Sequence, residues 1–256
     1  MTPATGRRIL LHPSAPAGTG KKLLEEVTRD ATERGLSSVH FLFCEASELP
    51  ELEAAGYLPR HSYQFHWRNK GYTTFESFLA DFKSRKRKQI HLERQSVASV
   101  PVSVFTGVEI RPELAEIFYP FYWSTCEKKG AYAYLRPAFF EEVFATMPEQ
   151  VVLFLAGTPG AWTAASLCFR SGQHLYGRYW GCAEEIPGLH FELCYYRPIA
   201  FAIENGLRLF EAGAQGEHKV ARGFLPELTY SAHWIAHPGF RGGIAQFLES
   251  DRKSVV

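Results

Sequence analysis

Three side chains in the last third of the sequence have the chemistry of a proton acceptor. Glu211 is expected at the carboxyl end of a buried strand, where a carboxylate among apolar residues needs a partner or a function. His218 lies in the loop that follows, and an imidazole titrates near neutral pH. Glu192 lies in the first turn of a predicted helix, where the helix dipole lowers a carboxyl pKa and burial raises it again. Each is a candidate catalytic residue, and the sequence leaves open which of them is the base.

The same loop carries two cations that could hold a phosphate or a carboxylate. Lys219 and Arg222 are predicted to bind the anionic part of a substrate. Six further side chains complete the predicted substrate-binding set: Arg178, Tyr179, Trp180, His190, Gln215 and His233. Three structural alternatives stay open. They are a solvated charged loop, a first-turn carboxylate that only stabilises its helix, and a buried ion pair of Glu211 with Arg178 or Arg222.

A strand, a helix and a second strand are expected to position these residues. Residues 177–182 end a strand, residues 189–205 form a helix with one apolar face, and residues 207–211 form a strand that opens into the charged loop. In this order an α/β protein builds a pocket at the carboxyl ends of its strands. Tyr179 and Trp180 are adjacent on a strand, so they point to opposite faces of the sheet and one of them is expected in the core.

The remaining segments predict an α/β chain of two unequal parts. Residues 1–71 contain a helix, a strand, a short helix and a strand, and are expected to form a partial unit. Residues 72–256 are expected to form a complete unit that begins with one long basic helix over residues 74–99. A strand over residues 100–107, two helices and three strands follow that helix, and the first two of the three strands are expected to form an antiparallel hairpin. A strand over residues 229–236 and a terminal helix close the chain.

The composition describes a globular protein without a general attraction for nucleic acid or membranes. The chain has 256 residues, 46% of them hydrophobic, and a formal net charge of +1, so any electrostatic attraction must be local. Its five scattered cysteines lack zinc-binding spacing, which predicts reduced thiols and no bound metal. No apolar stretch approaches the ~20 residues of a membrane span, and the first residues lack the apolar segment of a signal peptide. These features favour a cytoplasmic protein.

The C-terminal half carries strings that are similar to those of a known group of transferases. AIENG, FEAG and ARGF follow the order of helix, strand and polar loop found in the Fem-like branch of the GNAT superfamily. LYGRYWGC, LHFELCYY, FEAGAQGEHKVARGFLP and YSAHW resemble the hallmark strings of a bacterial family of predicted N-acyltransferases, labelled peptidoglycan biosynthesis or recognition. The resemblance covers essentially the whole chain, with a shorter N-terminal portion than such proteins usually carry.

This resemblance implies an α/β protein with a GNAT-like acyl-CoA N-acyltransferase fold, in which a complete C-terminal unit follows a partial N-terminal one. It also implies that an amine acceptor, a small metabolite or a peptidoglycan precursor, attacks an activated acyl or aminoacyl carbonyl directly. Relatives often have a lysine two positions before the Gly-Phe pair, where this chain has Ala221, so the role of that lysine does not carry over. A non-catalytic module of the same fold, recognising a cell-wall precursor, a protein partner or an acylated metabolite, is the alternative.

The acyl donor is expected to be a co-substrate, either acyl-CoA or aminoacyl-tRNA, with no tightly bound cofactor. Glu184 and Glu185 occupy the loop where acetyl-CoA enzymes of the superfamily hold pyrophosphate, and two carboxylates there would repel it. In the basic stretch KSRKRKQIHLER, Arg87, His91 and Arg94 could contact the phosphates of a tRNA, although such stretches are more often solvated surfaces. A partial first unit would leave a sheet edge open, which favours a homodimer.

Overall fold

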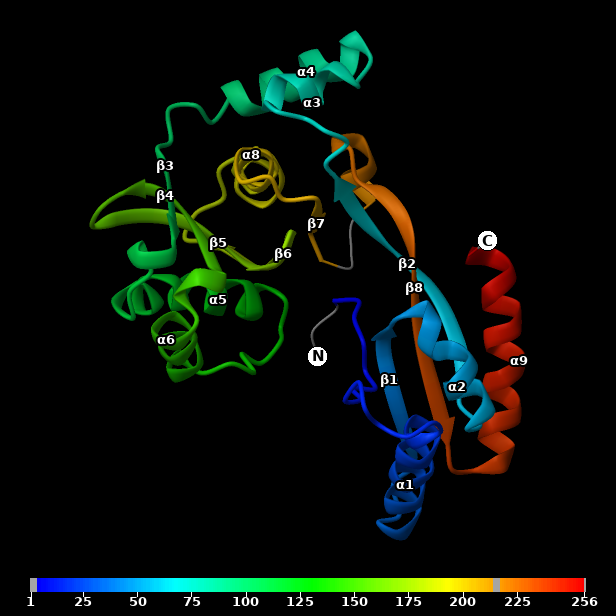
Figure 1. Ribbon diagram of the computed structural model, residues 1–256. Helices are drawn as coiled ribbons and strands as arrows, with labels where there is room; N and C mark the ends of the chain where they lie inside the picture. The colour runs from blue at the N-terminus through cyan, green and yellow to red at the C-terminus, as the bar shows by residue number, and fades with distance from the viewer. Residues whose placement is uncertain (1–3, 214–216, 256) are drawn as a thin grey trace. The chain divides into compact units, whose positions relative to one another are not determined.

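The computed structural model describes residues 4–213 and 217–255 (Figure 1). Its internal contacts divide the chain into two compact units. Unit 1 consists of the segments Met1–Gln64 and Pro226–Val256, and unit 2 is the continuous segment Phe65–Leu225. All three candidate bases lie in unit 2, so that unit is the one whose architecture positions the candidate site.

Unit 1 is built around three strands in the hydrogen-bonded order β1-β8-β2. Their bounds are β1 (Ser38–Cys44), β2 (Leu58–Arg68) and β8 (Leu225–Ile235). The helices of this unit are α1 (Thr19–Glu33), α2 (Leu49–Ala54) and α9 (Pro238–Val255). The predicted division at residue 71 places β8 and α9 in the second part of the chain. In the structure they group with unit 1, because β8 pairs with β1 in antiparallel register from Ser38–Ile235 to Cys44–Tyr230.

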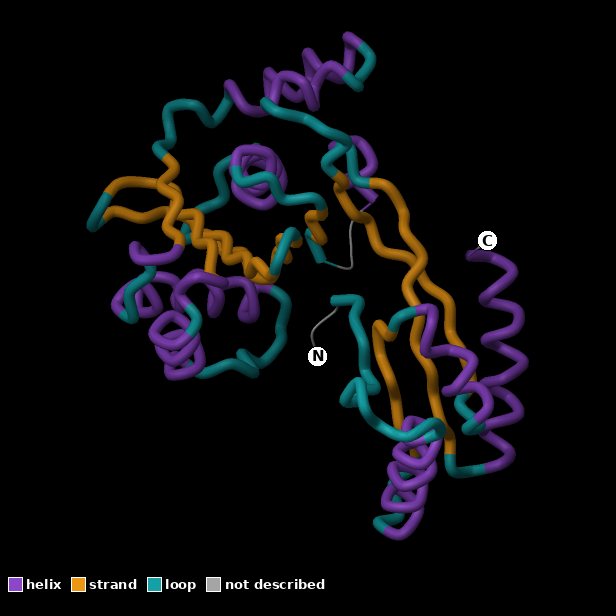
Figure 2. The backbone as a smooth tube through the Cα atoms, viewed as in Figure 1, coloured by secondary structure: helices purple, strands orange, loops and turns teal. Residues whose placement is uncertain are grey.

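Unit 2 contains the strand order β2-β7-β6-β5-β4-β3, and β2 contributes to both units because its last residues lie in unit 2. The further bounds are β3 (Val102–Thr106), β4 (Val151–Thr158), β5 (Ala161–Ser171), β6 (His174–Cys182) and β7 (Leu209–Glu211). Each neighbouring pair in this order is antiparallel except β6 with β7, which is parallel. Figure 2 shows the strands in orange. The predicted antiparallel hairpin of β4 and β5 and the predicted third strand, β6, are confirmed.

The parallel pair β6–β7 is short, and the two strands part beyond it. Tyr176 pairs with Glu211, the last residue of β7, whereas β6 continues to Cys182. Gly177 allows the chain after β7 to pass close to β6, since a Cβ on Gly177 would lie 3.4 Å from the Cα atom of Ala212. The end of β6 is therefore left without a parallel neighbour among the described residues, which opens space at its carboxyl end.

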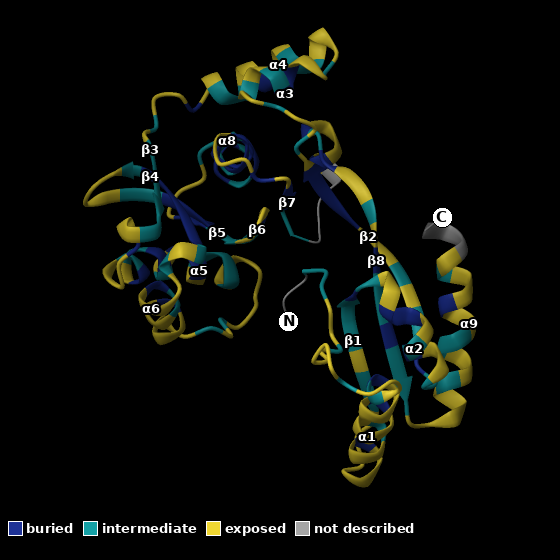
Figure 3. Cartoon of the chain, in the orientation of Figure 1, coloured by how far each residue is buried: buried dark blue, intermediate teal, exposed yellow. Residues whose placement is uncertain are grey.

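Helices cover both faces of the unit 2 sheet. On one face, α7 (Leu189–Phe191), a π-helical turn (Glu192–Tyr196) and α8 (Arg197–Glu204) follow one another without a break. On the other face lie α5 (Glu113–Lys128) and α6 (Pro137–Thr146), which pack Phe118 and Phe140 into a separate apolar cluster. The buried residues of unit 2 concentrate along β4, β5 and α8 (Figure 3). The predicted helix over residues 189–205 is confirmed, with a π-turn that hydrophobic periodicity does not reveal.

The predicted single helix over residues 74–99 is wrong. The structure has two helices there, α3 (Phe75–Ala80) and α4 (Ser84–Gln95), separated by residues with an extended Lys83. Phe78 and Phe82 keep the i, i+4 spacing of one helix across the break, which is why the sequence pattern does not reveal it. Both rings lie against Gly223, where a Cβ would come within 2.8 Å of Phe78. The break thus lets α3 pack on the loop that follows the candidate bases.

The described helices include none that is both long enough and apolar enough to cross a membrane. No group of three or more His, Cys, Asp or Glu side chains within the described residues is arranged to hold a metal ion. All five cysteines are free thiols.

Candidate functional site

A pocket of about 450 Å³ lies in unit 2 at the carboxyl end of β6, where the order of elements predicts one. Its walls come from the last turn of α5, the end of β6, the loop after β6 and the start of α7. The lining residues are Thr125, Lys128, Lys129, Trp180, Cys182, Glu185, Ile186, Pro187, Leu189 and His190. Two of them, Trp180 and His190, belong to the predicted substrate-binding set.

Close backbone contact holds the end of α5 against β6. A Cβ on Gly181 would lie 1.8 Å from the carbonyl oxygen of Phe121, so only glycine fits at that position of the strand. The Thr125 hydroxyl donates a hydrogen bond to the carbonyl oxygen of Trp180 at 2.6 Å. This local geometry brings the two lysines at the end of α5 to the rim of the pocket.

The charged groups of the pocket are two lysines and one glutamate. Lys128 Nζ lies 3.3 Å from Glu185 Oε1 and 3.8 Å from Cys182 Sγ. The hydrogen bond to Glu185 raises the pKa of Lys128. Lys129 has no ion pair within the described residues. Two ammonium groups against one carboxylate leave the pocket with an excess positive charge, located at Lys129.

His190 is a half-buried titratable group in the wall of the pocket. Burial lowers its pKa to about 4, and the nearby positive groups His218, Arg222, Lys129 and Lys219 contribute to that shift. The imidazole is therefore neutral at pH 7. Its ring contacts the Trp180 ring edge-on, with the centroids 5.3 Å apart. A neutral ring nitrogen in a pocket with a positive surrounding can accept a hydrogen bond from an amine.

Behind His190 lies a hydrogen-bonded pair that joins the pocket to the loop after β7. The hydroxyl of Tyr195 and Nε2 of His218 are 2.8 Å apart, and the tautomer of His218 decides which of them donates. The His190 ring lies 5.6 Å from the Tyr195 ring and 6.2 Å from the His218 ring, measured between centroids. Burial, followed by the charges of Arg222 and Lys219, lowers the pKa of His218.

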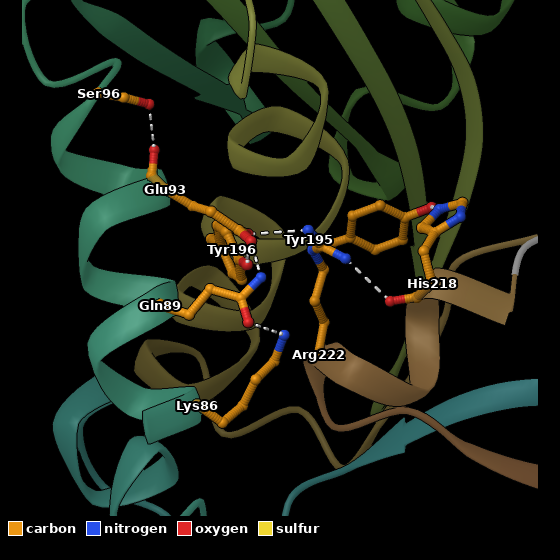
Figure 4. A network of polar contacts seen from close by, with 8 residues as sticks. All are labelled: Lys86, Gln89, Glu93, Ser96, Tyr195, Tyr196, His218 and Arg222. Carbon is orange, nitrogen blue, oxygen red and sulfur yellow. Dashed lines mark hydrogen bonds and ion pairs between the residues drawn. The ribbon is translucent and has the colours of Figure 1, made fainter. Parts of the chain in front are cut away.

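Arg222 holds this loop to α4 through a buried network (Figure 4). Its Nη2 lies 2.8 Å from Glu93 Oε2, and its Nη1 donates a hydrogen bond to the carbonyl oxygen of His218 at 2.9 Å. The guanidinium also lies over the ring of Phe191, 3.5 Å from the centroid. Arg222 is predicted to hold a substrate anion, and the structure gives its charge a carboxylate of the chain itself.

Glu93 is ionised within this network. Burial raises the pKa of its carboxyl group, but hydrogen bonds from Tyr196, Arg222 and Gln89 and the charge of Arg222 lower it by more, so the pKa is below its usual value. The Tyr196 hydroxyl donates to the same Oε2 atom that Arg222 contacts (Figure 4). A single carboxylate oxygen thus joins α4, the π-turn and the loop.

Glu192, at the other end of the π-turn from Tyr196, also binds positively charged side chains of the chain. It is buried, and Arg94 donates to both of its carboxylate oxygens, at 3.0 and 3.1 Å. Arg197 Nε lies 2.9 Å from Oε1. Two arginines therefore lie against the carboxylate of this candidate base. Arg94, a predicted RNA contact, directs its guanidinium to Glu192 and covers the ring of Phe75 at 4.4 Å.

Lys219 is a lysine in an apolar setting. Its residue is 1% exposed, and its Nζ donates a hydrogen bond to the carbonyl oxygen of Gly213 at 2.7 Å. Burial lowers the pKa of the ammonium group to about 8, with a small opposing contribution from Cys194. Its charge reaches His190 and His218, whose pKa values it helps to lower.

Glu211 lies in a separate cluster where β2, β6 and β7 meet. Its carboxylate is buried, with Oε2 3.9 Å from Nε2 of His66 on β2. Burial lowers the pKa of Arg178, and the charge of Glu211 opposes that shift. The Arg178 guanidinium lies 5.1 Å from the centroid of the Tyr176 ring. Glu211 and Arg178 are thus electrostatic neighbours at the parallel end of the pair, away from the residues that line the pocket.

Besides Arg178, Lys219 and Arg222, three further predicted binding residues are not among the residues that line the pocket. Tyr179 points to the opposite face of the sheet from Trp180 and packs on Tyr122, with the ring centroids 5.2 Å apart. His233 lies in unit 1, where its Nδ1 is 2.8 Å from Nδ1 of His40. Gln215 lies outside the described residues.

The structure therefore brings together His190, Trp180, His218, Lys219 and Arg222, and sets Glu192 and Glu211 in ion-pair environments. Sequence reasoning did not find the pocket residues of α5, nor the polar roles of Tyr195, Tyr196 and Glu93. The glycine in the β6 string YWGC was a usable signal for close approach of another backbone, but nothing in the sequence identified that backbone as α5.

The sequence as a whole matches one protein family. The profile of the FemAB-like family, described as peptidoglycan biosynthesis/recognition, matches residues 1–256. The chain belongs to the FemAB-like family. No curated protein matches this FemAB-like sequence.

Solved structures share the fold of this FemAB-like protein at low sequence identity. One is the C-terminal domain of a putative lysylphosphatidylglycerol synthetase from Agrobacterium fabrum, with a TM-score of 0.62, 10% identity, and coverage of 92% of this chain and 79% of that one. L-PGS from Bacillus licheniformis has a TM-score of 0.61 at 10% identity, covering 91% and 80%. FemX has a TM-score of 0.55 at 13% identity, covering 88% and 78%. The predicted GNAT-like α/β fold is confirmed.

Proposed function

We propose that this FemAB-like protein transfers an activated acyl or aminoacyl group to the amine of an acceptor, and that the pocket at the end of β6 is where the amine meets the acyl carbonyl. The proposal is supported by the family match and by the fold shared with FemX, with L-PGS and with the C-terminal domain of a putative lysylphosphatidylglycerol synthetase. The observation that carries it is a neutral, half-buried imidazole, His190, inside a pocket whose surroundings are positive.

The reaction forms a C–N bond and breaks the ester or thioester bond of the donor. The lone pair of the amine attacks the carbonyl carbon, and negative charge develops on the carbonyl oxygen. His190 accepts the proton that the amine loses and returns it to the oxygen or sulfur of the departing donor. The positive charges that lower the pKa of His190 in the free protein stabilise the developing oxyanion, and that oxyanion in turn raises the basicity of the imidazole.

The other polar groups support His190 from behind. In this proposal His218 and Tyr195 form a hydrogen-bonded reserve for the proton, and the ammonium of Lys219 contributes positive potential. Glu192 and Glu211 are assigned structural roles, because two arginines hold the first and the second lies with His66 and Arg178.

The proposed donor is an aminoacyl-tRNA and the proposed acceptor a peptidoglycan precursor, in line with the family description. The surface of α4 and the residue before it still presents Lys83, Arg85 and Lys88, all exposed, which suits contact with a phosphate backbone. Acyl-CoA is the competing donor. Glu184 is exposed in the loop after β6 and would oppose a pyrophosphate there, whereas Glu185 is partly neutralised by Lys128.

Transfer assays with a panel of aminoacyl-tRNAs, acyl-CoAs and amine acceptors test the proposal. With the active pair, His190→Ala should lower kcat by about 100-fold or more, as expected for loss of a general base. His12→Ala, a change at an exposed histidine of unit 1, is the matched control and should keep the wild-type rate. Saturable binding of an acceptor without turnover of any donor would refute the enzymatic function and leave a binding module. Full activity of His190→Ala would refute the role of His190.

A further inference from the structure

The pocket has one wall suited to an apolar or ring-shaped group and one suited to an anion. Trp180, Ile186, Pro187 and Leu189 supply apolar surface. The other wall carries the ammonium groups of Lys128 and Lys129 at the end of α5. Lys128 forms an ion pair with Glu185, whereas Lys129 does not. Lys129 is exposed, so the anionic group of a ligand in this pocket would displace only water from its ammonium group.

We propose that the pocket binds its substrate through a carboxylate or phosphate group held by Lys129, with Lys128 as the second cation, while the adjoining part of the substrate lies against Trp180. This inference rests on the proposed function, because it names the chemistry of the acceptor in the same pocket. An acceptor of this class carries its reactive amine and its anionic group in one molecule. The anion at the α5 rim then directs the amine toward His190.

The ion pair of Lys128 with Glu185 sets the affinity of this anion site. Glu185 belongs to the loop after β6, and its side chain is 82% exposed, so it is free to turn away into solvent. In the free protein its carboxylate occupies the position beside Lys128 that a substrate anion would take. An incoming anion competes with Glu185 for Lys128, whereas Lys129 is available without competition. Substitution of Lys129 should therefore weaken anion binding, and substitution of Glu185 should strengthen it.

The test is a titration of the full chain with four probes, namely acetate, inorganic phosphate, pyrophosphate and CoA, followed by the NMR signals of the His190 ring. Lys129→Gln should weaken binding of the preferred probe about threefold to tenfold, the range expected for one partly exposed charge pair. Glu185→Gln should tighten binding by a similar factor, because it releases Lys128. Lys22→Gln, at an exposed lysine of α1, is the matched control and should change nothing.

The outcomes separate this inference from the proposed function. Preference for acetate supports a carboxylate acceptor, and preference for phosphate or pyrophosphate supports a phosphate-bearing one. Tight binding of CoA alone, with no response to the small anions, would overturn the assignment of the anion to the acceptor. Unchanged affinity in both Lys129→Gln and Glu185→Gln would overturn the site itself. Anion binding with the predicted signs in a protein that shows no transfer would support this site and refute the enzymatic function.

Discussion

Two regions of unit 2 use the same residue types for opposite purposes. In the network around Arg222, a guanidinium and a carboxylate are buried together, with side chains 5% and 19% exposed. At the pocket rim, Lys128 and Glu185 also form an ion pair, but their side chains are 48% and 82% exposed. Burial therefore decides whether a pair of charges fixes the fold or stays available for a ligand.

The two regions differ because water can replace the partner of an exposed charge but cannot reach a buried one. An exposed ion pair loses little when it breaks, because water solvates both partners. A buried pair cannot be broken cheaply, since the remaining charge is left in a medium of low dielectric constant. The network around Glu93 also satisfies its charges with hydrogen bonds from Tyr196 and to the carbonyl of His218. Within the described residues, the charged groups at the rim lack such additional hydrogen bonds, so they remain available to a ligand, as a binding site requires.

Removal of the buried carboxylate should have the largest effect on stability. Glu93→Ala leaves the guanidinium of Arg222 buried without its anion, and we expect the free energy of unfolding to fall by about 3 kcal/mol or more. Urea denaturation measures the change, with Glu141→Ala on an exposed position of α6 as the control. A loss no larger than that of the control would show that Arg222 finds another partner or solvent, and would remove the contrast between the two regions.

The second buried carboxylate should matter less, because its partners can reach water. Glu192→Gln keeps the shape of the side chain but removes the charge that Arg94 and Arg197 share. Their side chains are 26% and 42% exposed, so both can turn toward solvent, and we expect a loss of about 2 kcal/mol. Urea denaturation of this variant beside Glu93→Ala gives the ranking directly. An effect of Glu192→Gln larger than that of Glu93→Ala would contradict the explanation by partner burial.

The pocket histidine should make stability depend on acidity. The pKa of His190 is lowered to about 4 in the folded state, whereas an unfolded chain has a histidine pKa of about 6.5. The unfolded state therefore binds the proton more readily, so stability is fully present above pH 6.5 and is lost as the pH falls toward 4. His190→Asn should reduce that loss by about 2 kcal/mol, measured by urea denaturation at pH 7 and pH 4.5. Equal slopes for the variant and the wild type would mean that His190 is solvated.

Much of the fold could be predicted because it follows local patterns. The strands β4 to β6 and the helix from Leu189 are recognisable from apolar periodicity and turn residues, and their order gave the GNAT-like topology. The break between α3 and α4 could not be seen, since Phe78 and Phe82 keep helical spacing across it. The assignment of β8 to unit 1 also escaped prediction, because it depends on pairing with a strand about 190 residues earlier in the sequence.

The site was predicted only where it coincides with sequence neighbours. Trp180, His190 and His218 were recognised because they flank a strand end and a loop. Glu93 was not, since its partner Arg222 lies 129 residues away and its function arises from burial that no local pattern encodes. The lysines of α5 escaped for the same reason. Which charges are buried together is a property of tertiary packing, so the distinction between fixing and binding charges becomes visible only in the structure.

The smallest expected effect is the one that sharpens the comparison most. Lys128→Ala removes an ammonium group whose partner is exposed, so the melting temperature should be unchanged relative to the wild type. The same change should raise the KM for an anionic acceptor while leaving kcat close to its wild-type value, because the lysine contributes binding in the ground state and the transition state alike. Calorimetry and acceptor-dependent rates measure the two properties on one sample. A fall in melting temperature with an unchanged KM would place Lys128 with the charges that fix the fold. The rim would then differ from the network around Arg222 in exposure, but both would serve to stabilise the fold.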